Sequence, residues 1–475
     1  MQRGTFQVKA TGSRPKIMVT ADGRGVVGHA GARLLADVAE ATGLVVGFGE
    51  ALARTRQRAS GHDPGRVAVD LAVMLAGGGE AIADLAVLRD QVGLFGPVAS
   101  DATAWRVLAS LDERALAELR AARAAAREVA WAQAVETRGG LPASTAAGVG
   151  IEGLVLDVDA SIVVCHSVKE SAAKTWKKSF GYHPIFCFLD ATGEALSAIL
   201  RPGNAGSNTT ADHIEVLDRA LAQIPDGRRH GEPILIPSDS AGCSFGFLAH
   251  IRGLREHGVN TCFSVGVAVD EPVRAAISAL PEKIWVPALH ADGGIRDGAQ
   301  VAEITDLLDR AGYPQGTRLI VRRERPHPGA QLSLFDTVAG FRHQVFATDT
   351  PYAGGGSIQF LEARHRAHAR VEDRIRCGKD TGFGRFPSRT FAINAAWLEL
   401  ALTGIDLIAW TQTLLLDGDL ARAEPKKLRY RLLHVAARIA RTGRHTWLRI
   451  AARWPWATEL ATAFTRLQAL PRPVT

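Results

Sequence analysis

The chain has 475 residues, of which 47% are hydrophobic and 22% charged, with a formal net charge of +7. That length suits two to four domains of ordinary size. No run of about 18 apolar residues is free of charge, and the N-terminal stretch before Lys16 lacks an apolar core, so we expect neither a membrane span nor a secretory signal. The five cysteines are scattered without a CxxC pair, which argues against a zinc site or disulfide framework and favours a reducing cytoplasm.

The basic residues are concentrated in the last quarter of the chain. From residue 361 to the end, 20 lysines and arginines stand against 10 aspartates and glutamates, a net charge of +10. Since the whole chain carries +7, residues 1–360 carry −3. This asymmetry favours a polyanionic partner such as nucleic acid, although the solvated surface of an arginine-rich chain would explain it equally well.

Residues 1–145 are predicted to be helical. Apolar residues recur at spacings of three and four in the segments 31–44, 66–78, 80–90 and 101–112, and a long Ala/Arg-rich helix follows at 113–135. Ser100 and Asp101 suit the N-cap of the fourth segment. The glycines, prolines and serines of residues 137–150 are typical of a linker.

The pattern then changes to strands. We expect strands at 152–167, 183–190 and 194–203, a helix at 208–224, a strand at 232–241, a helix at 245–258 and a strand at 259–267. This order is the connectivity of an α/β fold with an RNase H-like mixed sheet, here spanning residues 150–269. A mainly β insertion is expected at 270–358, a further core helix at 359–415 and a basic helical region at 416–475.

Two carboxylates interrupt the apolar segment "LVLDVDASIV" of the first predicted strand. Asp157 and Asp159 point to the same face of that strand, and burying an unpaired carboxylate costs several kcal/mol or more. Asp239 ends a second strand, and Glu372 lies on a later helix that could pack across the same face. Three carboxylates on separate elements can hold two divalent cations, such as Mg²⁺, for phosphoryl transfer.

Other roles for these acids compete with metal binding. Paired carboxylates also serve glycosidases, but 6% aromatic residues supply no evident sugar platform. For Asp157 alone, the favoured interpretation is a structural role, as a cap or in a pair with a nearby arginine. For the set of three, the strand order favours metal chemistry.

Five segments together resemble one family. They are "LVLDVDASIVVCHSVKESAAKTWKKSFGYHP", "AILRPGNAGSNT", "SDSAG", "RHRAHARVEDRIRCGKDTGFGRFPS" and "NAAWLELALTGIDLIAWTQ". They resemble bacterial insertion-sequence transposases of the DDE type, over about residues 25–470. The resemblance implies cut-and-paste DNA transposition by a homodimer in the bacterial cytoplasm, near the nucleoid. It also implies two Mg²⁺ ions, replaceable by Mn²⁺, and double-stranded DNA partners: the terminal inverted repeats and the target.

The resemblance assigns the metal ligands residue by residue. The family's first acid precedes Thr or Ser by two positions, which fits Asp159 and Ser161; the second and third acids fall on Asp239 and Glu372. Cut-and-paste relatives carry the signature Tyr-x2-Arg-x3-Glu-x6-Lys around the glutamate. Glu372 and Lys379 keep that spacing, whereas His365 and His368 stand in the Tyr and Arg places, which puts the strand-positioning role of these two places in doubt.

Basic side chains around these motifs are candidate DNA contacts, with a solvated surface as the competing interpretation. The candidates are Lys169, Lys174, Lys177, Lys178, His365, His368, Arg370, Lys379, Arg431, Arg438 and Arg441. The N-terminal helices resemble the family's DNA-end-binding region but show no helix-turn-helix signature. For Trp285, in the predicted insertion, packing is favoured over base stacking. Two other functions stay open: a transposase-derived DNA-binding protein without catalysis, and a nuclease on the same core.

Overall fold

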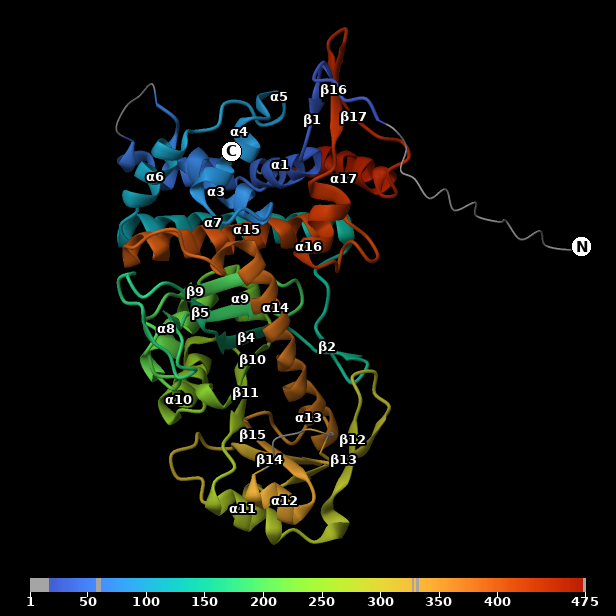
Figure 1. Cartoon of the computed structure of the whole chain (residues 1–475). Helices are drawn as coiled ribbons and strands as arrows, with labels where there is room; N and C mark the ends of the chain where they lie inside the picture. Colours follow the sequence, from blue (N-terminus) through green and yellow to red (C-terminus); the bar gives the residue numbers. More distant parts are fainter. Residues whose placement is uncertain (1–16, 57–60, 327–328, 330–332, 473–475) are drawn as a thin grey trace, which may run out of the picture.

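The computed structural model describes residues 17–56, 61–326, 329 and 333–472. A helical layer occupies one end of the molecule, at the top of Figure 1, and contains the N-terminal region that was predicted to be helical. The side chains of Asp63, Ser100 and Asp112 cap three of its helices. The helices are α1 (Arg33–Ala41), α2 (Leu44–Ala51), α3 (Pro64–Ala76), α4 (Ala86–Arg89), α5 (Val92–Phe95), α6 (Asp101–Ala109) and α7 (Glu113–Arg138).

A mixed sheet lies beneath this layer, and nine strands form it in the described part of the chain, in the order β12-β13-β14-β15-β11-β10-β4-β8-β9. β4, β10 and β11 are parallel neighbours. β8 pairs antiparallel with both β4 and β9, so β8 runs in the opposite direction to these strands. Helices α8, α9 and α10 lie between the later core strands in the chain, so the predicted RNase H-like connectivity is confirmed. The elements are β4 (Leu154–Ala160), β8 (Ile185–Leu189), β9 (Ala195–Ile199), α8 (Thr210–Leu221), α9 (Asp226–Gly231), β10 (Ile234–Ser238), α10 (Phe245–Gly253) and β11 (Thr261–Val267).

Residues 270–358 extend this sheet instead of forming a separate β body. The last of their strands pairs antiparallel with β11, with Val265 opposite Ala347. Two helices accompany the strands and were not expected from the sequence. The elements are α11 (Glu271–Ser278), β12 (Val286–Leu289), β13 (Ile295–Glu303), β14 (Arg318–Glu324), α12 (Leu334–Ala339) and β15 (Arg342–Thr348).

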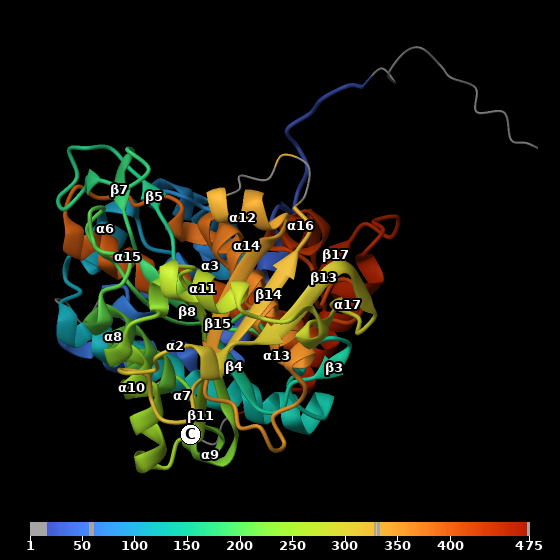
Figure 2. The same cartoon turned by 90° about the horizontal axis from the view of Figure 1, so that it is seen from below.

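Helices cover both faces of the sheet (Figures 1 and 2). α8 and α10 pack on one face, against β9 and β11 respectively. α13 (Ile358–Arg366) and α14 (Arg370–Gly378) lie across the other face, where α14 contacts β4. The helix that carries Glu372 therefore crosses the strand that carries Asp157 and Asp159.

The long helix α15 (Phe391–Leu415) joins the helical layer to the sheet, packing on α3, α7 and β9. Among the described residues, it is the one helix long and apolar enough to cross a membrane, with a mean hydropathy of 1.5. However, 72% of its most apolar window is buried inside the protein, as expected for a core helix.

Buried charges join α7 to α15 and the edge of the sheet. Arg127 has no exposed side-chain surface and pairs with Glu194, at 2.9 Å, and with Asp406. One turn earlier, Arg123 pairs with Glu399 at 3.2 Å. Such a network is stable only when every charge keeps its partner, because a lone buried charge is strongly unfavourable.

The C-terminal region is helical at its two ends but not over the whole of the helix predicted for 426–443. The chain forms α16 (Pro425–Leu428), a π-helical turn (Arg429–Leu433), a hairpin of β16 (Ala437–Thr442) and β17 (His445–Ile450), and then α17 (Ala457–Ala469). The apolar spacing that suggested one long helix also fits strand alternation, since Ile439 pairs with Leu448. Gly443, at a φ of 59°, starts a two-residue turn, and β1 (Val26–Val27) pairs with β16.

Candidate active site

The two aspartates of β4 share one face of the strand but have different surroundings. Asp157 is 2% exposed, and Nδ1 of His368 lies 2.8 Å from its Oδ1. Burial raises the pKa of Asp157, and the hydrogen bond with His368 opposes that rise. Asp157 therefore has a protein partner, as the sequence favoured, but the partner is a histidine and not an arginine.

Asp159 lies nearer the carboxyl end of β4 and is partly exposed. Its Oδ1 accepts a hydrogen bond of 2.7 Å from the N–H of Ala160. Burial, followed by the negative charges of Asp239 and Glu372, raises the pKa of Asp159 to about 6. The fold thus brings the three predicted acids close enough for their charges to interact.

Asp239 and Glu372 reach this region from two other elements. Asp239 follows β10, whose Ser238 is in register with Val158 of the parallel strand β4. It is exposed, and its Oδ1 accepts a hydrogen bond of 2.9 Å from the N–H of Ala241. Glu372 is exposed in the first turn of α14. Parallel strands end on the same edge of a sheet, which explains why Asp159 and Asp239 are neighbours.

This cluster of acids has cationic neighbours but no direct ion pair: His368 lowers the pKa of Asp159, and the charge of Asp159 acts on Lys379. Among the described residues, none of Asp159, Asp239 and Glu372 forms an ion pair with a lysine or arginine. Concentrated negative charge of this kind suits hard divalent cations, which prefer oxygen ligands. Among the described residues, no three His, Cys, Asp or Glu side chains stand in positions that could hold a metal ion.

The two histidines in the Tyr and Arg places of the signature face the protein. The ring of His365 stacks on Phe346, with centroids 4.4 Å apart, and burial lowers its pKa to about 3, so it is neutral. Burial opposes protonation of His368, but the hydrogen bond with Asp157 and the negative charges of Asp157, Asp159 and Asp239 together raise its pKa. Both side chains have protein partners in this structure, and their contact with DNA phosphates stays a prediction.

Arg370 and Lys169 likewise hold segments of the protein together. Arg370 donates to both carboxylate oxygens of Asp190, at 2.7 and 2.6 Å. Lys169 Nζ donates to the backbone carbonyls of Phe386 and Ser388, at 2.8 and 2.7 Å. The structure therefore gives each of these predicted DNA contacts a structural partner.

Lys379 lies at the edge of the acid cluster. Its Nζ donates to Ser161 Oγ at 2.7 Å and to the carbonyl of Ile162 at 2.9 Å, and thus holds the segment that follows β4. Burial, followed by repulsion from Lys177, lowers the pKa of Lys379, while Asp159 acts in the opposite sense. The ammonium is therefore close enough to sense both Asp159 and Lys177.

The remaining predicted lysines are exposed on a small sheet beside the cluster. In the described part of the chain this sheet has three strands: β5 (Val163–Val164), β7 (Phe180–Tyr182) and β6 (Ala173–Lys174). Lys174, Lys177 and Lys178 have exposed side chains there. Lys177 lies over the ring of Trp176, with 4.9 Å from Nζ to the ring centroid. These lysines keep their predicted place on an open surface.

The C-terminal arginines that are candidate DNA contacts do not lie on one helix. Arg438 and Arg441 are exposed on β16, and their separation of three residues puts them on opposite faces of that strand. Arg431 is half-buried, with its guanidinium 5.0 Å from the centroid of the Trp456 ring. The charge excess is therefore spread over a hairpin and a packed turn.

This geometry changes the expected salt dependence of DNA binding. A duplex lying on one face of β16 contacts Arg438 or Arg441 but not both. We expect one of R438Q and R441Q to lower the log–log salt slope by about one unit, the other little, and R431Q not at all. Fluorescence anisotropy titrations over a range of salt concentrations measure the slopes; three unchanged slopes would show that the hairpin does not touch phosphate.

Two contacts of the site and its surroundings were not found from the sequence. The hydrogen bond between His368 and Asp157 could have been predicted from the sequence, since the spacing of four residues places His368 on the same helix face as Glu372. No sequence pattern predicts the pairing of Arg370 with Asp190, because it depends on how α14 crosses the end of β8. Trp285, for which packing was favoured, is 7% exposed beneath the guanidinium of Arg323.

A mixed sheet that brings two strand aspartates and a helix glutamate together is the arrangement of the DDE transposases that the sequence resembles. A family model described as "Transposase DDE domain group 1" matches residues 9–472, and the chain belongs to that family. Among solved structures, the chain is similar to a piggyBac transposase, studied by cryo-electron microscopy as a synaptic complex with hairpin DNA. The two share 9% identity with a TM-score of 0.35, over 85% of this chain and 79% of that one. No curated protein matches the chain.

Proposed function

We propose that this transposase cuts the ends of a mobile element and joins them to target DNA, with Asp159, Asp239 and Glu372 as ligands for two Mg²⁺ ions. The observation that carries the proposal is the proximity of these acids. Burial and then the negative charges of Asp239 and Glu372 raise the pKa of Asp159, and none of the three forms an ion pair with a lysine or arginine among the described residues. Two bound cations, with Mn²⁺ as a substitute, would activate the attacking oxygen and stabilise the leaving oxygen.

The chain's own groups position the reacting DNA. Asp159 and Asp239 project from adjacent parallel strands, so their backbones are fixed by the sheet, and Glu372 approaches from α14. Lys379 holds the segment after β4 and presents its ammonium beside Asp159, where it can also bind a phosphate oxygen. In this arrangement water attacks the phosphodiester at the element end, and the freed 3′ hydroxyl then attacks a second phosphodiester.

The test is a reaction with purified protein, duplexes that carry the element's terminal inverted repeats, and target DNA. We expect nicking and joining with Mg²⁺, none with EDTA, and binding without efficient cutting with Ca²⁺. Binding without any cutting would favour a DNA-binding relative without catalysis, and cutting without joining would favour a nuclease. Sedimentation of the protein–DNA complex tests the proposed homodimer.

The pKa of Asp159 predicts a pH dependence. A carboxyl with a raised pKa of about 6 is mostly protonated below that pH, and a proton competes with a metal ion for it. We therefore expect Mg²⁺-dependent nicking to fall as the pH drops through about 6, with the midpoint moving lower at higher Mg²⁺ concentration. A midpoint that does not respond to Mg²⁺ would assign the titration to another group.

A further inference from the structure

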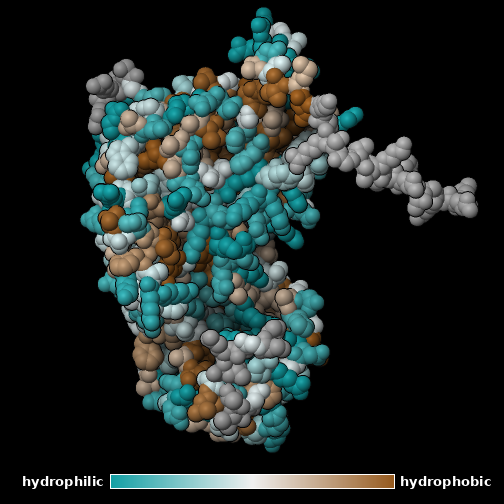
Figure 3. Space-filling model, viewed as in Figure 1, coloured by the Kyte–Doolittle hydropathy of each residue, from teal (hydrophilic) through white to brown (hydrophobic). Residues whose placement is uncertain are grey.

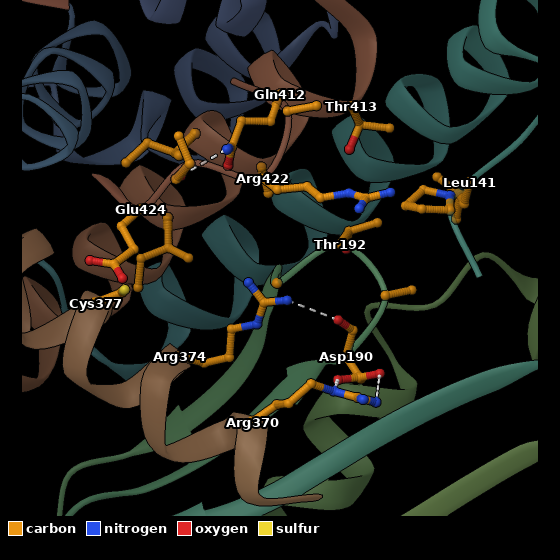
Figure 4. A pocket seen from close by; sticks show the side chains of 18 of the residues that line it. Leu141, Asp190, Thr192, Arg370, Arg374, Cys377, Gln412, Thr413, Arg422 and Glu424 are labelled. Atoms are coloured by element: carbon orange, nitrogen blue, oxygen red, sulfur yellow. Dashed lines mark hydrogen bonds and ion pairs between the residues drawn. The ribbon is translucent and has the colours of Figure 1, made fainter. Parts of the chain in front are cut away.

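A large cavity lies behind the helix that carries Glu372 (Figure 4). Its volume is about 910 Å³. Its walls are α14, the C-terminal half of α15, the turn between β8 and β9, and the segments 138–145 and 421–425. Leu141, Ile405 and Ile408 give it an apolar floor. Figure 3 shows hydrophilic surface gathered over this part of the molecule, between the helical layer and the sheet.

α14 separates this cavity from the acid cluster. Residues advance by about 100° each around an α-helix, so Glu372 and Arg374 lie about 200° apart. The charge of Glu372 acts on Asp159, while Arg370, Arg374 and Cys377 line the cavity. One short helix therefore presents a proposed metal ligand on one side and arginines on the other.

The cavity carries more positive charge than its acids neutralise. Of the described residues, the arginines that line it are Arg138, Arg370, Arg374, Arg376 and Arg422, against the acids Asp190, Asp373 and Glu424. Three of these arginines are ion-paired with carboxylates.

The other two arginines have spare hydrogen-bonding capacity. Arg374 donates to the backbone carbonyl of Asp190 at 3.1 Å, and Figure 4 shows the side chains of Arg374 and Arg422 extending into the cavity. Arg422 is exposed and has no hydrogen bond or ion pair with any described residue. An arginine rim above an apolar floor suits a ligand that combines phosphates with flat rings, which is the chemistry of a nucleic-acid strand.

We propose that this cavity is a second DNA-binding site, in which Arg374 and Arg422 bind phosphodiester groups of one DNA strand and the apolar floor receives its bases. This inference rests on the proposed function and adds a consequence to it. Because α14 forms a wall of the cavity, a strand bound there fixes the helix that presents Glu372 to the acid cluster. Arg374 and Arg422 are thus positioning residues.

Cys377, on the cavity wall, provides a reporter in the natural chain. Its alkylation by iodoacetamide is followed by mass spectrometry, with and without an end-containing DNA whose binding is measured in parallel by anisotropy. Burial raises the pKa of the Cys377 thiol, so the reaction is run at about pH 8.5. The variants are R374Q/R422Q and, as a matched control, R114Q, which removes a charge at the far end of α7, about 36 Å along that helix from Arg138.

We expect bound DNA to slow Cys377 alkylation severalfold in the wild type and in R114Q, but not in R374Q/R422Q at a DNA concentration where that variant is still saturated. Absence of DNA binding in the anisotropy measurement would instead overturn the proposed function. Binding without protection of Cys377, or protection that persists in R374Q/R422Q, would overturn only the second site. Protection by ATP or pyrophosphate alone, but not by DNA, would reassign the cavity to a free nucleotide and also overturn it.

Discussion

Replacing Asp159 with asparagine is expected to lower the rate of Mg²⁺-dependent nicking by at least about two orders of magnitude, while DNA binding and the fold are kept. A neutral amide cannot bridge two cations, and loss of such a ligand removes a few kcal/mol of transition-state stabilisation. The same loss is expected for D239N and E372Q. Asp157→Asn is the matched control, because it changes a carboxylate two residues away on the same face of β4.

The control separates a metal ligand from a structural acid. The amide that D157N introduces can still hydrogen-bond with His368, so this variant is expected to keep measurable nicking. Single-turnover nicking of an end-containing duplex, with circular dichroism to verify folding, measures the four variants. An inactive D157N beside an active D159N would mean that the wrong carboxylate of β4 had been assigned. Wild-type rates in all four would contradict the metal site itself.

Replacing Arg127 with methionine is expected to cost about 3–5 kcal/mol of unfolding free energy, because Glu194 is then buried without its cation and Asp406 keeps only the more distant Arg123, at 3.5 Å. Urea denaturation followed by circular dichroism measures the loss. Burial raises the pKa of Asp406 to about 6 even with Arg127 present. Removal of Arg127 is expected to raise the pKa of Asp406 further, so that Asp406 takes up a proton at a higher pH in R127M. Because a protonated Asp406 carries no buried charge, the difference in unfolding free energy between R127M and the wild type should narrow as the pH falls from about 8 to about 5.

An exposed arginine of the same helix gives the comparison. Arg114 pairs with Glu118 on the surface of α7, with 74% of its side chain exposed. Surface pairs contribute little, so R114M should leave the urea midpoint unchanged. Equal midpoints for R127M and R114M would show that the buried network does not stabilise the fold.

Local sequence patterns were sufficient to predict the core of this fold. The apolar runs of β4 and β8, the aspartate that follows β10, and the N-cap Ser100 are signals within a few residues. These local preferences are kept in the fold because the packing of the sheet and of the helical layer favours the same helices and strands. The strand pattern also predicted that Asp159 and Asp239 lie close together, since the ends of parallel strands meet at one edge of the sheet.

The failures have a different origin. The segment around Ile439 fits helical and strand periodicity alike, and the strand is selected by pairing with β17 across the turn at Gly443 and with β1, which lies more than 400 residues earlier in the chain. The partners of His365, His368 and Arg370 depend on how α13 and α14 cross the sheet. No pattern within those helices specifies that crossing, so charge alone could not predict the internal partners of these side chains.

The pairing of β1 with β16 also constrains how the protein is made. Val26 is opposite Arg438, and the N–H of Ala30 donates to the carbonyl of Val435, so an early strand of the chain is completed by a late one. During synthesis the N-terminal helices emerge long before α15 and the hairpin on which they pack, and a chain that stops before about residue 435 cannot close this layer. Folding of the helical layer therefore depends on residues near 435–438, and a chain truncated before them is left with an open apolar surface that favours aggregation or degradation.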